Sequence, residues 1–125
     1  MSLRMSVLPD CLAICRLAPD AVVPPWATQG AFFSITRTTE ELSIILERER
    51  IPADVDFEGP WRVFKVEGPI QLSAVGILAS IAEPLAQADI SLFAISTFDT
   101  DYVLVQADQL EAAQAALCRA GHTIH

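Results

Sequence analysis

The sequence is short of basic residues and has no long apolar run. Eight Lys and Arg residues stand against sixteen Asp and Glu among 125 residues, giving a formal net charge of −8 and a pI near 4.5. Because a nucleic-acid site needs a concentrated basic surface, we expect no nucleic-acid partner. No apolar run reaches the roughly 18 residues of a membrane span, and MSLRMSVLPD lacks the apolar region of a secretory signal. We therefore expect a cytoplasmic protein with no membrane partner.

Metal-binding and catalytic motifs are also missing. Cys11, Cys15 and Cys118 form an odd number without C-x-x-C or zinc-ligand spacing, which favours buried, reduced thiols over metal or redox chemistry. His122 and His125 have no third ligand within sequence reach, so we predict no metal site. No G-x-S-x-G, H-E-x-x-H or G-x-G-x-x-G string occurs. The sequence thus predicts neither a cofactor nor enzymatic activity.

The second half of the chain carries the clearest structural pattern. An amphipathic segment with apolar residues three and four apart predicts a helix over 71–88, interrupted late by Pro84. Asp108 and Glu111 have the spacing of a capping box, and Gly121 suits a helix C-terminus. The predicted elements are strand 61–67, helix 71–88, strands 91–96 and 101–106, helix 109–119 and a short strand over 122–125. Their order is βαββαβ, the ferredoxin-like α+β arrangement.

The first half predicts a smaller set of elements. Strands are expected at 10–17, 31–36 and 42–46, with an irregular connection around Pro24 and Pro25 in place of a long helix. The charged segment 47–60 ends in Pro, Gly and Pro and is typical of a solvated connection, although a ligand site there is an alternative. We therefore predict two modules, a truncated one at 5–58 and a complete one at 59–125.

The two halves resemble each other. With a shift of sixty residues and no gap, apolar and polar positions of one predicted hairpin fall on those of the other: Phe33, Ile35, Thr36, Glu41, Leu42, Ile44 and Ile45 on Phe93, Ile95, Ser96, Asp101, Tyr102, Leu104 and Val105. Each half is too small to bury a core alone. We interpret the pattern as a duplication in which the first copy has lost most of its helices.

Three strings carry a family resemblance. These are V-E-G-P-I-x-x-S-x-V-G-I-L-A-S-I, E-P-L-A-x-A-D-I and I-S-T-F-x-T-D-Y-V-L-V, and in the first half C-R-L and S-I-T-R-T-x-x-E-L-S-I fit the same pattern. The chain resembles small tandem ACT-domain proteins and is similar to the ACT modules of cytosolic arginine sensors. The resemblance implies an ACT fold, pairing through sheets, and binding of an amino acid or similar metabolite without catalysis.

A candidate ligand site follows from the residues and from the resemblance. A helix start after Gly68 attracts a carboxylate, and the turn after residue 96 offers hydroxyls, an aromatic ring and carboxylates. By resemblance, Gly76, Ile77, Thr97, Phe98 and Asp101 lie where the arginine sensors contact ligand, and Ser73 and Ala74 at the helix start complete the predicted ligand site. Ala74 stands where the arginine sensors carry an acidic residue. Alternatively, Gly76 serves close helix packing, and Thr97–Thr100 is only a hairpin turn.

The sequence thus predicts a non-catalytic sensor that binds an amino acid. A dimerisation or protein-interaction module with a vestigial ligand site is the alternative. In both cases the aromatic and apolar excess, including Trp26, Phe32, Phe33 and Trp61, favours a homodimer, because a monomer rarely leaves a large apolar patch exposed.

Overall fold

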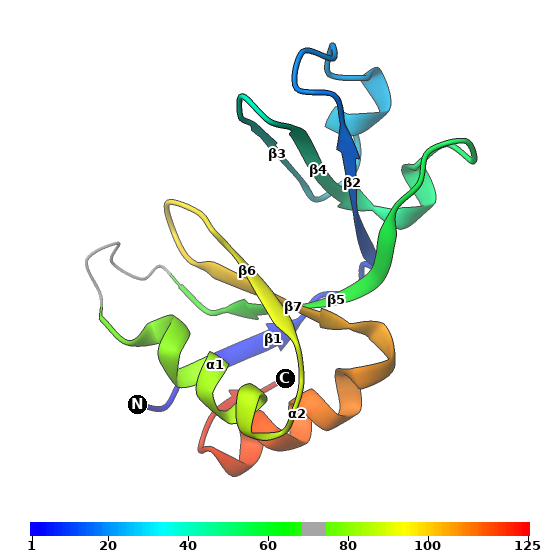
Figure 1. The fold of residues 1–125 in the computed structure, drawn as a ribbon. Coiled ribbons are helices and arrows are strands. Elements are labelled where there is room, and N and C mark those ends of the chain that lie inside the picture. The colour runs from blue at the N-terminus through cyan, green and yellow to red at the C-terminus, as the bar shows by residue number, and fades with distance from the viewer. Residues whose placement is uncertain (69–74) are drawn as a thin grey trace. The chain divides into compact units, whose positions relative to one another are not determined.

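The computed structural model describes residues 1–68 and 75–125, and these divide into two units (Figure 1). Residues 10–61 form what we call the N-terminal unit, whereas residues 1–9 and 62–125 form the C-terminal unit. The chain thus starts in the C-terminal unit, passes through the N-terminal unit and returns. Strands and helices combine in the order expected, and the predicted α+β fold is confirmed.

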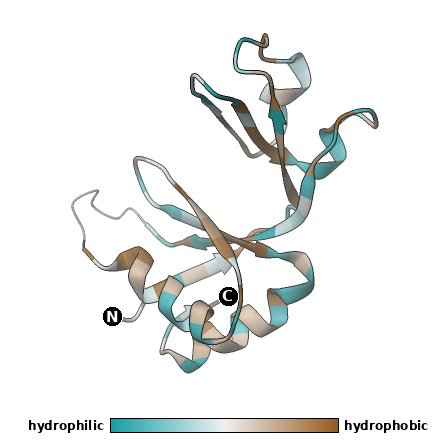
Figure 2. Cartoon of the chain, viewed as in Figure 1, coloured by the Kyte–Doolittle hydropathy of each residue, from teal (hydrophilic) through white to brown (hydrophobic). Residues whose placement is uncertain are grey.

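The N-terminal unit is a small antiparallel sheet with a one-sided core. Strands β2 (Leu12–Leu17), β3 (Phe33–Arg37) and β4 (Leu42–Glu47) lie in the order β3-β4-β2, and the first residues of β5 (Glu58–Val66) pair with β2. Two 3-10 turns, η1 (Pro25–Thr28) and η2 (Arg48–Arg50), lie in the connections. Leu42, Ile44 and Leu46 alternate along β4 and are fully buried. In Figure 2 this hairpin is hydrophobic along β4 and hydrophilic at its turn.

The C-terminal unit has the predicted βαββαβ order with one added strand. Its elements are β1 (Arg4–Val7), β5, α1 (Ile77–Gln87), β6 (Leu92–Ser96), β7 (Asp101–Gln106), the 3-10 turn η3 (Ala107–Gln109), α2 (Leu110–Arg119) and β8 (Thr123–Ile124). The strands lie in the order β6-β7-β5-β1-β8, and both helices cover one face (Figure 1). Buried side chains from β1, β5, β7 and both helices form its core.

Strand β1 was not predicted from the sequence. It lies between β5 and β8, antiparallel to the first and parallel to the second. Met5 is fully buried among Phe64 and Val66, which accounts for the docking of so short a strand. Residues 5–9 therefore pack in the C-terminal unit rather than with residues 10–61.

Two element boundaries differ from the predictions. Strand β5 begins at Glu58 rather than Trp61, because its first residues pair with β2; Gly59 has a φ of +143°, and a Cβ there would lie 3.0 Å from the carbonyl oxygen of Leu12. The start of the predicted helix 71–88 lies in part outside the described residues. At 75 and 76 the helix prediction was wrong, since α1 begins at Ile77 and Gly76 has a left-handed φ of +86°.

The predicted capping box of the last helix is also wrong. The N-cap of α2 is Gln109, no side chain caps it, and η3 precedes the helix. The glycine expected after the helix is confirmed, with Gly121 at φ +100°. Among residues 1–68 and 75–125, no helix is both long and apolar enough to cross a membrane.

The helix α1 continues past Pro84 because another residue replaces the missing hydrogen bond. Proline has no amide hydrogen, so the carbonyl of Ser80 lacks its donor within the helix. The buried His122 supplies it, with Nε2 2.8 Å from the Ser80 oxygen, while Nδ1 accepts the backbone N–H of Leu3 at 3.1 Å. Since a carbonyl only accepts, Nε2 carries the proton. One imidazole thereby joins α1, the segment before β1 and the segment before β8.

We expect this compensation to appear as coupling between Pro84 and His122. His122→Ala leaves a carbonyl and an amide without partners and should lower the free energy of unfolding by about 2 to 3 kcal/mol. In a Pro84→Ala background the restored amide can serve Ser80, so the cost should fall by about 1 kcal/mol. Urea denaturation of the four proteins measures the coupling. The exposed His125→Ala is the control and should cost the same in both backgrounds; zero coupling at His122 would contradict the interpretation.

Candidate functional site

The candidate site centres on the hairpin of β6 and β7. Their register pairs Ser96 with Asp101 and Leu92 with Val105, leaving Thr97–Thr100 as a four-residue turn. The backbone N–H of Thr97 donates to the Thr100 oxygen at 2.8 Å, and the Thr97 hydroxyl lies 3.1 Å from that oxygen and 3.3 Å from the Thr100 amide. Thr97 therefore closes the turn with both its backbone and its side chain.

The hairpin of the N-terminal unit closes in the same way. The N–H of Thr38 donates to the Glu41 oxygen at 2.9 Å, and the Glu41 amide donates to the Thr38 hydroxyl at 3.2 Å. Arg37 faces Leu42 as Ser96 faces Asp101. Equivalent residues of the two hairpins are therefore 59 positions apart in the sequence. The shift of sixty predicted from the sequence was wrong by one residue.

This correction changes the interpretation of Asp101. In the sequence alignment Asp101 fell on Glu41, which made an acid at the turn look like a shared feature. In the structure its equivalent is Leu42, which is fully buried in the core of the N-terminal unit. Asp101 is itself only 8% exposed, so a carboxylate occupies a position where the other hairpin has a core leucine. A buried carboxylate is costly without partners.

Asp101 points to the face of the sheet that the helices cover. Side chains alternate along β7, and Val103 and Val105 belong to the core with Ile81 and Leu85 of α1. The hydroxyl of Ser96, directly opposite, donates to Asp101 Oδ1 at 2.6 Å. Among the described residues, Ser96 is the one side-chain hydrogen-bond partner of the Asp101 carboxylate.

The start of α1 contributes the other half of the candidate site. Gly76 is the N-cap and has no side chain that could accept from the helix, whose first backbone bond runs from Ser80 to Gly76. The amides of Ile77 and the next two residues thus lack intrahelical acceptors and attract an anion. Among residues 1–68 and 75–125, a Cβ on Gly76 would meet only Met1 Cε, at 4.0 Å, so the alternative that Gly76 serves close packing of the helix on the sheet is wrong. Its left-handed φ is the reason for glycine.

The structure places the predicted residues in two groups. Thr97, Phe98 and Asp101 share one hairpin, where Phe98 is 82% exposed at the turn, and Gly76 and Ile77 share one helix end. Ser73 and Ala74 lie outside the described residues. Sequence reasoning missed Ser96 and also Thr100, which is buried with its hydroxyl donating to the Val66 carbonyl at 2.5 Å. The four-residue turn places Ser96 opposite Asp101. A correct prediction of the strand register would therefore have identified Ser96 as a neighbour of Asp101.

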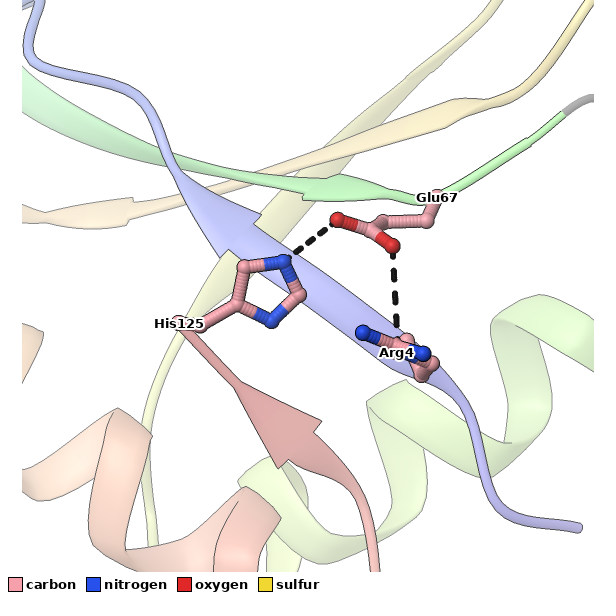
Figure 3. Close-up of polar contacts among 3 residues, drawn as sticks. All are labelled: Arg4, Glu67 and His125. Atoms are coloured by element: carbon pink, nitrogen blue, oxygen red, sulfur yellow. Dashed lines mark hydrogen bonds and ion pairs between the residues drawn. The ribbon is translucent and has the colours of Figure 1, made fainter.

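Two further polar clusters have structural roles. In the C-terminal unit, Glu67 lies between His125, with Nε2 2.5 Å from Oε1, and Arg4, with Nε 3.7 Å from Oε2 (Figure 3). In the N-terminal unit, the Nε of Arg50 donates to the Glu47 carboxylate at 2.6 Å and holds the pKa of that carboxyl below its ordinary value. In residues 1–68 and 75–125, no group of three or more His, Cys, Asp or Glu side chains has the geometry to hold a metal ion.

The prediction of buried cysteines is partly wrong. Cys15 is buried, and burial raises the pKa of its thiol, so it is an unreactive core group. Cys11 and Cys118 are exposed, and Cys11 precedes β2.

A βαββαβ unit with two helices on one face defines a ferredoxin-like protein, here with a second, smaller antiparallel sheet unit. The chain belongs to the ACT-domain family, since the family model described as ACT domain matches residues 56–119. A separate model, of an N-terminal domain, matches residues 10–54. The predicted resemblance to ACT proteins is therefore confirmed.

Individual proteins agree with this assignment. "Cytosolic arginine sensor for mTORC1 subunit 1" of Bos taurus is 34% identical over 103 residues, which cover 76% of this chain and 31% of that protein. The chain thus spans about a third of that relative's length. The crystal structure of protein Atu0741 from Agrobacterium tumefaciens matches with a TM-score of 0.93 and 39% identity, covering 100% of this chain and 93% of the other. Protein VC0802 of Vibrio cholerae, at 21% identity and a TM-score of 0.79, covering 96% and 91% of the two chains, shares the fold.

We predict that the turn threonines stabilise their hairpins in the absence of any ligand. Thr97→Ala and Thr38→Ala each remove the hydroxyl contacts of one turn and should lower the free energy of unfolding by about 0.5 to 1.5 kcal/mol, measured by urea denaturation. Thr97→Ser keeps the hydroxyl and should recover most of the loss. Thr39→Ala, at an exposed turn position, is the control. If Thr97→Ala leaves stability unchanged, its hydroxyl serves a ligand alone.

Proposed function

We propose that this protein is a non-catalytic regulatory protein that binds a small molecule, an amino acid, in the cytoplasm. The observation that carries the proposal is the buried carboxylate of Asp101 at a position where the equivalent hairpin has the core residue Leu42. The similarity to a protein named as an arginine sensor supports the same ligand class. An amino acid has both charges that the two groups of site residues attract.

The proposed binding mode uses both ends of an amino acid. The ligand carboxylate lies at the start of α1, where the amides of Ile77 and the two residues after it have no intrahelical acceptors. The ammonium or a cationic side chain lies at Asp101, whose Oδ1 is already bonded to Ser96. Phe98, exposed at the turn, is available to cover the aliphatic part of the ligand. Each contact involves a charged group, so the two together provide both affinity and orientation.

The binding test compares two carboxylates of the same hairpin. The full chain is titrated by calorimetry with each of the twenty amino acids, and the tightest binder is then titrated against Asp101→Asn and Asp99→Asn. Asp101→Asn keeps the acceptor for Ser96 but loses the charge, so the affinity should fall about tenfold or more. Asp99→Asn removes the same charge from the turn and should change the affinity less than about twofold, since Asp99 is exposed. An unchanged affinity in Asp101→Asn would defeat the proposed mode.

A second function is favoured by the turn geometry. Thr38 closes a turn in the N-terminal unit with the same hydrogen bonds that Thr97 makes in the C-terminal unit. The presence of a threonine at position 97 therefore has a structural explanation that does not require a ligand. The site would then be vestigial and the protein a pairing module. Large apolar side chains are exposed in both units, namely Val22, Phe33, Phe57, Val75, Leu78 and Phe98.

For both functions we expect a homodimer. Burial of the exposed apolar side chains between two copies stabilises the pair, and light scattering at tens of micromolar should give twice the 13.6 kDa of the chain. A monomeric mass at that concentration would count against pairing. A dimer that binds no amino acid below about millimolar would favour the pairing module over the sensor.

A further inference from the structure

A buried hydroxyl ties the turn of the β6–β7 hairpin to the neighbouring strand. Thr100 is 3% exposed, and its hydroxyl donates to the backbone oxygen of Val66 at 2.5 Å. Val66 is the last residue of β5, the strand beside β7 (Figure 1). The residue that follows Thr100 is Asp101, the carboxylate of the proposed site. The hydrogen bond therefore holds the hairpin one residue before its buried acid.

The backbone oxygen of Val66 needs this donor. On the side of β1, the N–H of Glu67 donates to the Arg4 oxygen at 2.8 Å. Because backbone groups of successive residues in a strand point to opposite neighbours, the Val66 oxygen points toward β7. The N–H of Thr100 donates to the Thr97 hydroxyl instead, at 3.3 Å. The Thr100 hydroxyl therefore supplies the hydrogen bond that a backbone amide would otherwise give.

The hairpin of the N-terminal unit has no equivalent of this bond. At the shift of 59 residues, Glu41 corresponds to Thr100, and Leu42 corresponds to Asp101. Within residues 1–68 and 75–125, the side chain of Glu41 forms no hydrogen bond to a neighbouring strand. The buried hydroxyl and the buried carboxylate thus occur together, at consecutive positions of one hairpin, and both are missing from the other.

We propose that Thr100 is a positioning residue, which holds the end of the hairpin against β5 so that Asp101 is oriented toward the amino acid. This inference rests on the proposed function. A hydroxyl donates one proton, and that of Thr100 is given to Val66, so Thr100 acts through Asp101 and not as a donor to the ligand. Without the hydroxyl the turn can move away from β5 and carry Asp101 with it, and a charged contact weakens steeply when its geometry changes.

The test is a double-mutant cycle of binding on the full chain, with the tightest binder among the twenty amino acids as the probe. Thr100→Val keeps the shape of the side chain and loses the hydroxyl, and calorimetry should show about fivefold to tenfold weaker binding. Thr100→Ser keeps the hydroxyl and should stay within about twofold of the wild type. In an Asp101→Asn background, Thr100→Val should cost less than about twofold, because its effect passes through Asp101. Thr36→Val, at an exposed position of β3, is the control and should leave the affinity unchanged.

Amide hydrogen exchange without any amino acid provides a second readout. The amide of Thr97 donates to the Thr100 oxygen at the end of the hairpin, and Thr100→Val should raise its exchange rate about fivefold or more. The amides of Phe93 and Ile95, further along β6, should keep their rates, whereas a general loss of stability would raise all three.

The outcomes separate this proposal from the proposed function. If an amino acid binds and Thr100→Val leaves its affinity unchanged, or weakens it equally with and without Asp101→Asn, Thr100 is not a positioning residue and the proposed function stands. An unchanged exchange rate at Thr97 would also overturn the inference. Should the wild type bind no amino acid, the proposed function fails, and faster exchange confined to Thr97 still supports the hold of Thr100 on the hairpin.

Discussion

The register of the two hairpins is the constraint on which the rest of the polar arrangement depends. A slip of one residue in a strand pair moves every side chain to the opposite face. Thr38 and Thr97 close four-residue turns with the same hydrogen bonds, and each turn directs the residue that follows it toward the core side of its sheet. In one unit that residue is Leu42 and in the other Asp101. The same geometry thus buries a leucine side chain in one hairpin and a carboxylate in the other.

The buried residues of α1 lie in its middle and last turns. Ile81 and Leu85 are fully buried, and the imidazole of His122 holds the Ser80 carbonyl that Pro84 leaves without a donor. Toward the helix start, Val75 is 87% exposed and Leu78 37% exposed. In the proposed mode, a ligand carboxylate bonds backbone amides at that exposed end, while the residues beyond Ser80 are packed on the sheet.

Elements with local signals were predictable from the sequence and those that depend on distant partners were not. The strands β3, β4, β6 and β7 carry apolar runs between polar turns and were located within two residues. Strand β1 has only four residues and exists through its pairing with β5 and β8, far along the chain. The apolar pattern could not distinguish a shift of sixty residues between the two hairpins from a shift of 59. Both faces of β7 are apolar, since Leu104 is as buried as Val103, so apolar and polar residues do not alternate along this strand. Asp101 and Thr97 could be proposed as site residues, but the role of Ser96 required the register, and the start of α1 required the φ of Gly76.

The proposed hairpin site depends on both charges of its ligand. With a net charge of −8, the protein attracts cations generally and repels free anions, so this site needs no special chemistry to accumulate a cation. At the hairpin, the single carboxylate of Asp101, already bonded to Ser96, would bind a simple cation only weakly in water. In the proposed mode, it becomes selective when a carboxylate on the same ligand bonds the start of α1, since both charge-assisted contacts then depend on one molecule with the right separation of charges.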